Sequence, residues 1–170
     1  MVAVIRRYNI FFISDTHFTH VNALTFFNSD GSRMRPFESV AECDELMIEN
    51  WNNMIGKNDK VYHLGDVGFN QKALAEILPR LNGVKVLVKG NHDKFKPKFY
   101  LEYFKDIRGC HNLDNYLLSH FPVHPDSKAR FIKNIHGHVH NNTLSDEWYV
   151  NASVEVNNYA PIPYEEILQR

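Results

Sequence analysis

Short apolar runs recur along the chain, and longer segments with helical spacing lie between the first of them. The runs at residues 9–13, 60–64 and 84–88 are typical of buried strands, because each is short, continuous and rich in aromatic or β-branched residues. Further runs at residues 115–118, 131–135 and 148–150 predict three more strands. We therefore expect an α/β fold.

Two intervening segments carry the apolar spacing of helices. Ser39 and Glu42 form a capping-box pattern. The apolar residues after it fall on one helical face that ends before Gly56: Val40, Cys43, Met47, Trp51 and Ile55. Asn70 can cap a second helix, whose apolar residues are Ala73, Leu74, Ile77, Leu78 and Leu81. Pro79 should kink this helix or end it early.

The remaining segments give weaker patterns. Residues 21–27 predict one or two helical turns, and residues 164–168 predict a short C-terminal helix with Pro163 in its first turn. The basic and aromatic segment 95–104 has no assigned structure, because Pro97 interrupts it.

The composition is that of an ordinary globular protein. The chain has 170 residues, of which 44% are apolar and 23% charged, and it shows no repeat or linker, so we expect one domain spanning residues 1–170. The net charge of −1 gives no overall field to hold a polyanion, although a local site could still take phosphate.

Other compositional features bear on location. The two cysteines, Cys43 and Cys110, lack the spacing of a disulfide framework or zinc knuckle, which fits a reducing cytosol. No apolar stretch approaches the roughly 20 residues of a membrane helix. The apolar run that ends at Ile13 is too short for a signal peptide. We expect a cytoplasmic protein with no membrane partner; its oligomeric state is not predicted.

Five of the apolar runs end in side chains that can bind metal ions. In open α/β sheets, ligands collect outside the carboxyl ends of the strands, so these side chains should converge on one rim. Their convergence is a stronger indication than any single residue, since Asp and Asn also form turns. The candidates, in chain order, are Asp15 and His17, Asp66, Asn91, His120, and His138 and His140.

The number and type of these ligands favour two divalent ions. Carboxylate, imidazole and amide oxygen, without thiolate, suit Mn, Fe, Zn, Ni or Co. Seven ligands are too many for one ion, and Asp66, alone on its strand, is the natural bridge between two. Two divalent cations with only two carboxylates leave a positive site, which favours an anion such as phosphate.

These motifs resemble those of the calcineurin-like metallophosphoesterases. The resemblance covers nearly the whole chain. The chain is similar to the small, single-domain bacterial and phage members of the family. It implies a four-layer α/β/β/α sandwich of two mixed sheets flanked by helices. The matching motifs, in order, are Asp15-Thr16-His17, Gly65-Asp66, Gly90-Asn91-His92-Asp93, His120 and Gly137-His138-Val139-His140.

The resemblance also implies roles for these residues. It assigns one metal to Asp15, His17, Asp66 and His140, and the other to Asp66, Asn91, His120 and His138. A bridging hydroxide would attack phosphorus, and His92 would protonate the leaving oxygen. Asp93 would orient its neighbours. Manganese is the expected metal, with Fe, Ni, Zn or Co as alternatives.

One departure from the family pattern bears on the substrate. The protein phosphatase branch continues Gly-Asp with two residues and then Asp-Arg-Gly, whereas Gly65-Asp66 is followed here by Val67, Gly68, Phe69 and Asn70. An acidic partner and a phosphate-binding arginine are therefore missing. We expect a phosphodiester or small phosphate ester, such as a nucleotide, rather than a phosphoprotein.

Three further residues are candidate substrate contacts. His20 and Asn22 follow the first motif closely, and Arg35 lies in a loop from which a guanidinium could reach phosphate.

Two alternative functions stay open. A scaffold of the same fold would have lost catalytic activity, but such proteins usually lack the leaving-group histidine or metal ligands. A metal-dependent nuclease would need a basic groove beside the metals, and the net charge does not favour one.

Overall fold

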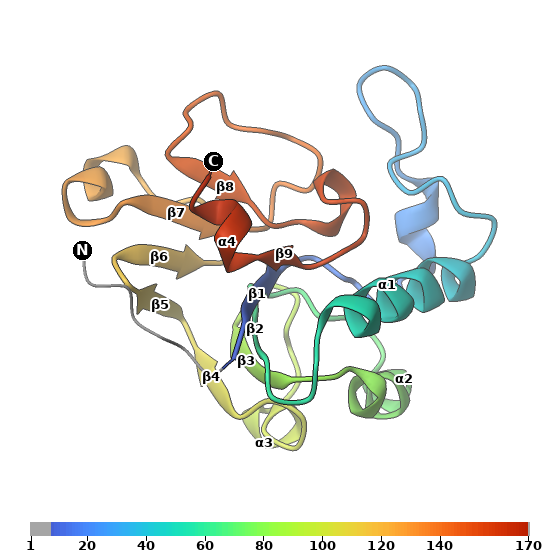
Figure 1. Ribbon diagram of the computed structural model, residues 1–170. Coiled ribbons are helices and arrows are strands. Elements are labelled where there is room, and N and C mark those ends of the chain that lie inside the picture. The colour runs from blue at the N-terminus through green and yellow to red at the C-terminus, as the bar shows by residue number, and fades with distance from the viewer. Residues whose placement is uncertain (1–7, 170) are drawn as a thin grey trace.

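The first of two mixed β-sheets has five strands in the order β4-β3-β2-β1-β9 (Figure 1). The computed structural model describes residues 8–169. Strands β1 to β4 are parallel, and β9 runs antiparallel to β1 at the edge. Their bounds are Ile10–Ile13 (β1), Lys60–His63 (β2), Val84–Val88 (β3), Asp106–Arg108 (β4) and Ile162–Pro163 (β9).

The second sheet has four strands in the order β5-β6-β7-β8. Strands β6, β7 and β8 are parallel, and β5 pairs with β6 in the antiparallel direction. Their bounds are Cys110–Leu113 (β5), Tyr116–Ser119 (β6), Lys133–His136 (β7) and Tyr149–Asn151 (β8). The six strands expected from the apolar runs are all present.

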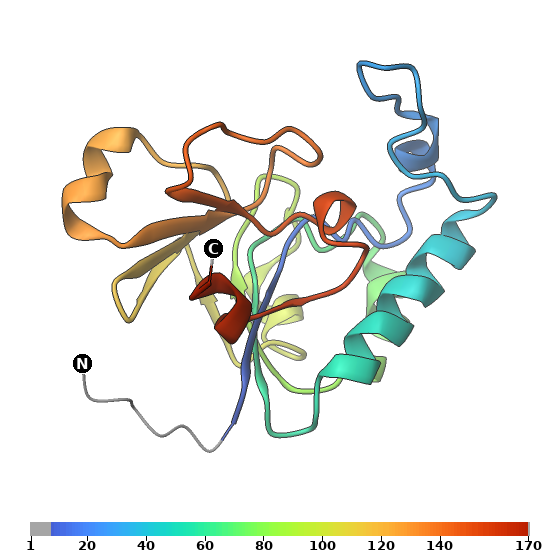
Figure 2. The ribbon, with the colours of Figure 1, turned by 45° about the horizontal axis from the view of Figure 1, so that its top comes forward.

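The alternation of side chains in the first sheet creates two hydrophobic cores. Phe11 and Ile13 of β1 pack into a core formed with the helices α1 and α2. Ile10 and Phe12 point to the opposite face and pack into a core shared with β6, β7 and β8. Figures 1 and 2 show α1 and the second sheet on opposite sides of the first sheet. The expected α/β architecture of two mixed sheets flanked by helices is confirmed.

The two longer helices follow the predicted pattern. Helix α1 spans Val40–Met54, and the Ser39 hydroxyl accepts the Glu42 N–H at 3.1 Å. Only this half of the capping box forms, because the Glu42 carboxylate accepts the N–H of Glu38 instead of Ser39. Helix α2 spans Gln71–Ile77 and is capped by Asn70. It gives way at Pro79 to the 3-10 helix η2, Leu78–Arg80.

The short elements show where sequence patterns are weakest. Pro97 begins the single-turn helix α3, Pro97–Tyr100, rather than interrupting one. Pro163 likewise precedes α4, Tyr164–Ile167, as its N-cap. Strands β4, β5 and β9 were not predicted, because they are short edge or near-edge strands without an apolar run. The 3-10 helices are η1 (Val21–Thr25), η3 (Pro125–Arg130) and η4 (Val154–Val156).

Among residues 8–169, no helix is long and apolar enough to cross a membrane.

Helix α1 buries one carboxylate against the loop that follows β1. Asp44 is 6% exposed, and its Oδ2 accepts the Thr19 N–H at 3.0 Å. Its Oδ1 has no hydrogen-bond partner among the described residues. Burial raises the pKa of Asp44 to about 6, because the buried charged form is poorly solvated. The folded state therefore binds a proton more tightly than the unfolded chain, and the Asp44 contribution to stability falls as pH rises from about 4 to about 6.

We expect Asp44→Asn to raise the free energy of unfolding at pH 8 by about 3 kcal/mol, since about two pKa units of unfavourable ionisation disappear while the acceptor for Thr19 is kept. The gain should vanish at pH 4. Urea unfolding of both proteins at the two pH values measures it, with the exposed Asp126→Asn as the matched control. A gain that does not depend on pH would contradict this account.

Candidate metal centre

The seven candidate ligands come together at the carboxyl ends of five strands. Asp15 and His17 follow β1, Asp66 follows β2 and Asn91 follows β3 in the first sheet. The second sheet contributes His120 after β6, and His138 and His140 after β7. The candidate ligands thus lie at the carboxyl ends of strands from both sheets, and not from a single sheet.

One oxygen of Asp66 lies between histidines from the two sheets. Its Oδ2 is 3.7 Å from Nε2 of His17 and 3.5 Å from Nε2 of His120. Two groups of ligand atoms, each within 4.8 Å of one another, share Asp15: one with His17 and His140, the other with Asp66 and His120. Each group could hold a metal ion, and the carboxylate that the two groups share is that of Asp15, whereas the sequence suggested Asp66 as the bridge.

In each of the two carboxylates, Asp15 and Asp66, one oxygen accepts hydrogen bonds from the protein. The other oxygen is left free to bind a cation. Oδ2 of Asp15 accepts the His138 N–H at 2.8 Å and the Ser153 hydroxyl at 2.9 Å. Oδ1 of Asp66 accepts the His92 N–H at 2.8 Å. The other oxygen of Asp15, Oδ1, is buried with no hydrogen-bond partner among the described residues. A buried oxygen without a partner destabilises the folded state unless a metal ion or a water molecule binds to it.

Two glycines allow the backbone to approach these carboxylates. A Cβ on Gly137 would lie 2.3 Å from Oδ2 of Asp15, and one on Gly90 would lie 2.2 Å from Oδ1 of Asp66. Both distances are far below van der Waals contact. Any other residue at these positions would push the neighbouring strand-end loops apart.

The ligand loops are also bent into an uncommon backbone conformation. A positive φ is unusual for residues other than glycine, and such residues cluster at functional sites. Five of the seven candidates have one: Asp15 (57°), His17 (45°), Asp66 (58°), His138 (71°) and His140 (51°). The surrounding hydrogen bonds must hold these conformations in place.

The hydrogen bonds of His120 fix which nitrogen faces the site. Its Nδ1 lies 2.8 Å from the carbonyl oxygen of Leu64, which can only accept, so Nδ1 carries the proton. Nε2 is then an unprotonated acceptor in the neutral ring, and it faces Oδ1 of Asn91 at 2.9 Å and the Asp66 carboxylate. Three acceptor atoms that face one another fit a cation between them.

His140 is oriented by Glu155, which the sequence reading missed. Nδ1 of His140 lies 3.0 Å from Oε1 of this buried carboxylate, so its Nε2 is left unprotonated in the neutral ring. Burial acts to lower the pKa of His140, but the hydrogen bond and charge of Glu155 outweigh it and raise the pKa. Glu155 lies on η4, more than ten residues from any motif, and no local pattern marked it.

Arg35 does not face the site as a substrate contact would. It is 2% exposed, and its guanidinium pairs with Glu155 at 2.6 Å and donates to the carbonyl oxygens of Asp15 and Thr16. This arrangement contradicts the substrate contact expected from the sequence. Arg35 instead holds the first ligand loop and neutralises Glu155, an ion pair that is costly to break from one side.

Burial also sets the protonation of other ring ligands. It lowers the pKa of His17 strongly and that of His138 more modestly, because the charged imidazolium is poorly solvated there. The neutral imidazole is the form that binds metal ions. The ring of His138 lies 5.1 Å from that of His120, beside the second group.

His92 and Asp93 occupy different positions. The half-buried His92 ring lines a cavity of about 200 Å³ with His17, Phe69 and His140. The carboxylate of Asp93 is buried and accepts backbone N–H groups from Asp66, Val67 and Gly90 at 2.8–3.0 Å. The carboxylate of Asp93 therefore joins the loop that carries Asp66 to the loop that carries Asn91.

The two other substrate candidates are placed differently from each other. His20 lines the same cavity, with its ring 4.1 Å from that of Phe69. Asn22 is exposed on η1 and is not among the described residues that line the cavity.

The chain is similar to known proteins along nearly its whole length. A family model for calcineurin-like phosphoesterases matches residues 8–169. An uncharacterized protein of Methanocaldococcus jannaschii is 37% identical over 174 residues, which cover 94% of this chain and 89% of the relative. A crystal structure of an Aquifex aeolicus protein of unknown function superposes with a TM-score of 0.75 at 31% identity, covering 96% and 99% of the two chains.

A more distant structure is that of a Streptococcus pneumoniae protein described as a predicted phosphoesterase. Its TM-score is 0.41 at 16% identity, with 88% and 73% of the two chains covered. This likeness is too weak to bear on the site.

We expect Glu155→Gln to weaken metal binding about 10- to 100-fold, because a residue that orients a metal-binding histidine typically contributes that much. Calorimetric titration of metal-free protein with Mn²⁺ or Zn²⁺ measures it, and circular dichroism checks that the variant is folded. The exposed Glu147→Gln makes the same chemical change elsewhere and should bind metal as the wild type does. Unchanged affinity in folded Glu155→Gln would contradict the role of Glu155.

Proposed function

Since this chain belongs to the calcineurin-like phosphoesterase family, a family of metal-dependent phosphoesterases, we propose that it hydrolyses phosphodiesters, such as those of nucleotides, at a centre of two divalent metal ions. The observation that carries the proposal is the Asp66 oxygen between His17 and His120, which joins ligands from two sheets.

The donor set fits two ions. Asp15, His17, Asp66 and His140 would hold one, and Asp66, Asn91, His120 and His138 would hold the other, with manganese favoured and Fe, Ni, Zn or Co as alternatives. When bound, such ions lower the pKa of water and neutralise the charge of a phosphoryl group. The unpartnered Asp15 oxygen and the acceptors facing His120 support this fit.

His92 is proposed to give a proton to the leaving oxygen. Its ring lies at the edge of the cavity, 5.7 Å from that of His17, and makes no hydrogen bond to any described residue. Its backbone N–H is tied to Asp66, so the ring is held beside the centre without being one of the ligands. A positioned acid of this kind contributes about 10²- to 10⁴-fold to the rate.

Three other residues act by positioning. Asp93 holds the loops of Asp66 and Gly90, and Arg35 with Glu155 holds Asp15 and His140. His20 lines the cavity beside Phe69 and is proposed to contact substrate.

The substrate remains a diester in this proposal, because the acidic and arginine residues of the protein phosphatase pattern are missing after Asp66 and Arg35 is engaged elsewhere. A scaffold without activity is less well supported, since every candidate ligand and His92 are present. The cytoplasmic location stays a prediction.

We expect chelated protein to cleave bis(nitrophenyl) phosphate only after metal is restored, and faster than nitrophenyl phosphate. Asp66→Asn should lose metal and turnover together, because it weakens the shared ligand. His92→Ala should keep its metal and lose about 10²- to 10⁴-fold in kcat.

The exposed His124→Ala is the matched control for His92→Ala and should keep full activity. Turnover that survives Asp66→Asn or His92→Ala would overturn the proposed centre. Cleavage of the monoester alone would leave a phosphoesterase but refute the diester preference.

A further inference from the structure

A basic hollow lies between helix α2 and the segment that contains α3. Its volume is about 900 Å³. Four of the residues that line it are exposed lysines, against a single carboxylate, that of Glu102: Lys72, Lys94, Lys96 and Lys98. Half-buried aromatic side chains, Phe95 and Tyr103, lie among them.

This hollow begins at the edge of the candidate active site. Lys94 is two residues after His92, and its N–H donates to the His92 carbonyl at 2.8 Å. With about 3.8 Å between successive Cα atoms, the two Cα atoms lie within about 8 Å. On the other side, Gln71 lines the hollow two residues after Phe69, whose ring is 5.1 Å from that of His92.

The lysines of the hollow have no anionic partner in the part of the chain that the structure describes. Three other exposed cations of the described chain are paired, Arg80 with Glu45, Arg108 with Asp106 and Lys128 with Asp146, whereas Lys57, Lys89 and Lys105 form no ion pair with a described residue. Within the described residues, none of the four lysines forms an ion pair. A net charge of +3 thus gathers beside the site of a chain whose overall net charge is −1.

From this placement we propose that the substrate is single-stranded nucleic acid, whose backbone runs through the hollow while one phosphodiester reaches the metal centre. Lysines would contact successive phosphates, and aromatic side chains would contact bases. The inference rests on the proposed function. Hydrolysis would add one water across one P–O ester bond, leaving a phosphate monoester on one fragment and a hydroxyl on the other.

The shape of the site favours a single strand over a duplex. The recess at His92 has a volume of about 200 Å³, and the rings of His17, His20 and Phe69 are among the groups that line it. A flexible strand can turn one phosphodiester into such a recess, whereas a stiff duplex cannot. The charged hollow would then supply the basic groove that the composition alone did not indicate.

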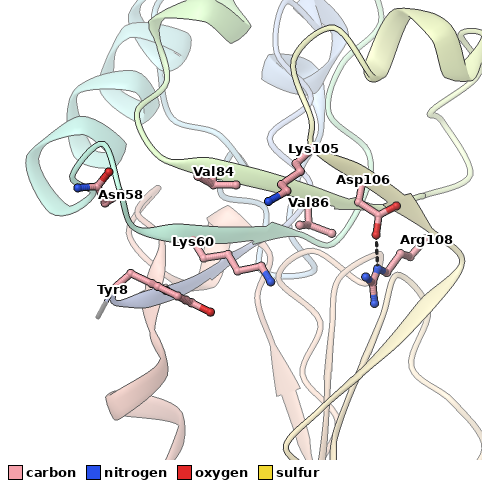
Figure 3. A pocket seen from close by; sticks show the side chains of 8 residues that line it. All are labelled: Tyr8, Asn58, Lys60, Val84, Val86, Lys105, Asp106 and Arg108. Carbon is pink, nitrogen blue, oxygen red and sulfur yellow. Dashed lines mark hydrogen bonds and ion pairs between the residues drawn. The ribbon is translucent and has the colours of Figure 1, made fainter. Parts of the chain in front are cut away.

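A second basic pocket provides the control. It has a volume of about 390 Å³ and lies at the amino ends of β2 and β3, opposite the ligand rim. Figure 3 shows its Lys60 and Lys105 between Tyr8 and Asn58 on one side and the Asp106–Arg108 ion pair on the other. Substituting lysines in this region removes as much positive charge as substituting lysines of the hollow, but leaves the hollow itself unchanged.

The test compares two triple variants in manganese-loaded His92→Ala protein, which should bind without cleaving. The hollow variant is Lys72→Ala, Lys96→Ala and Lys98→Ala. The control variant is Lys60→Ala and Lys105→Ala of the second pocket, together with Lys57→Ala, whose exposed lysine directly precedes Asn58. Fluorescence anisotropy measures binding of a labelled 12-nucleotide oligo-dT and oligo-U between 50 and 200 mM KCl. Cleavage of bis(nitrophenyl) phosphate by the same variants with His92 restored is measured in parallel.

We expect the hollow variant to lose at least about tenfold in affinity and its salt slope to fall by about two, at about 0.7 per lost phosphate contact. The control variant should match the parent. Equal losses in both variants, no oligonucleotide binding, or tighter binding of a duplex would overturn the proposal. If bis(nitrophenyl) phosphate is still cleaved in those cases, only this inference fails; if it is not cleaved either, the proposed function fails as well.

Discussion

Each of the two carboxylates at the centre of the site is fixed through one oxygen by a backbone N–H from another strand-end loop. His138 supplies the N–H for Asp15 across the two sheets, and His92 supplies it for Asp66 within the first sheet. The second oxygen of each then faces the ring nitrogens of neighbouring histidines or has no partner among the described residues. The approach is so close that only glycine is tolerated at positions 90 and 137. The loops, the ligands and the pairing of the two sheets all depend on these contacts.

The rest of the fold holds the two sheets at the separation that this arrangement needs. The core between them sets the distance from β1 and β2 to β6 and β7, because its side chains interdigitate from both faces. The Arg35–Glu155 pair adds a polar connection at the rim, joining the loop after β1 to His140. Burying this ion pair costs desolvation free energy, and removing one partner would cost more because a buried charge would be left unpaired. The Arg35–Glu155 pair therefore positions the loop and His140 rather than stabilising the fold.

Much of this arrangement was predictable from sequence, because the ligands directly follow apolar runs and the order of motifs is that of a known family. The six strands with apolar runs, the two main helices and their caps at Ser39 and Asn70 follow from local patterns, whereas β4, β5 and β9 do not. Glu155 and the true place of Arg35 do not, since they meet across 120 residues and neither carries a local signal. The lysine-lined hollow has the same origin: Lys72 and Lys96 belong to separate segments, and only the packing of α2 beside the 94–103 segment brings them together.

The central claim, that Asp66 joins two cation sites, is tested most directly by anomalous X-ray diffraction from crystals of manganese-loaded protein, with metal analysis of the same preparation. We expect two ions per chain, about 3.5–4 Å apart as in other two-metal sites, with Asp66 bound to both. A single ion, or two ions that do not share Asp66, would contradict it.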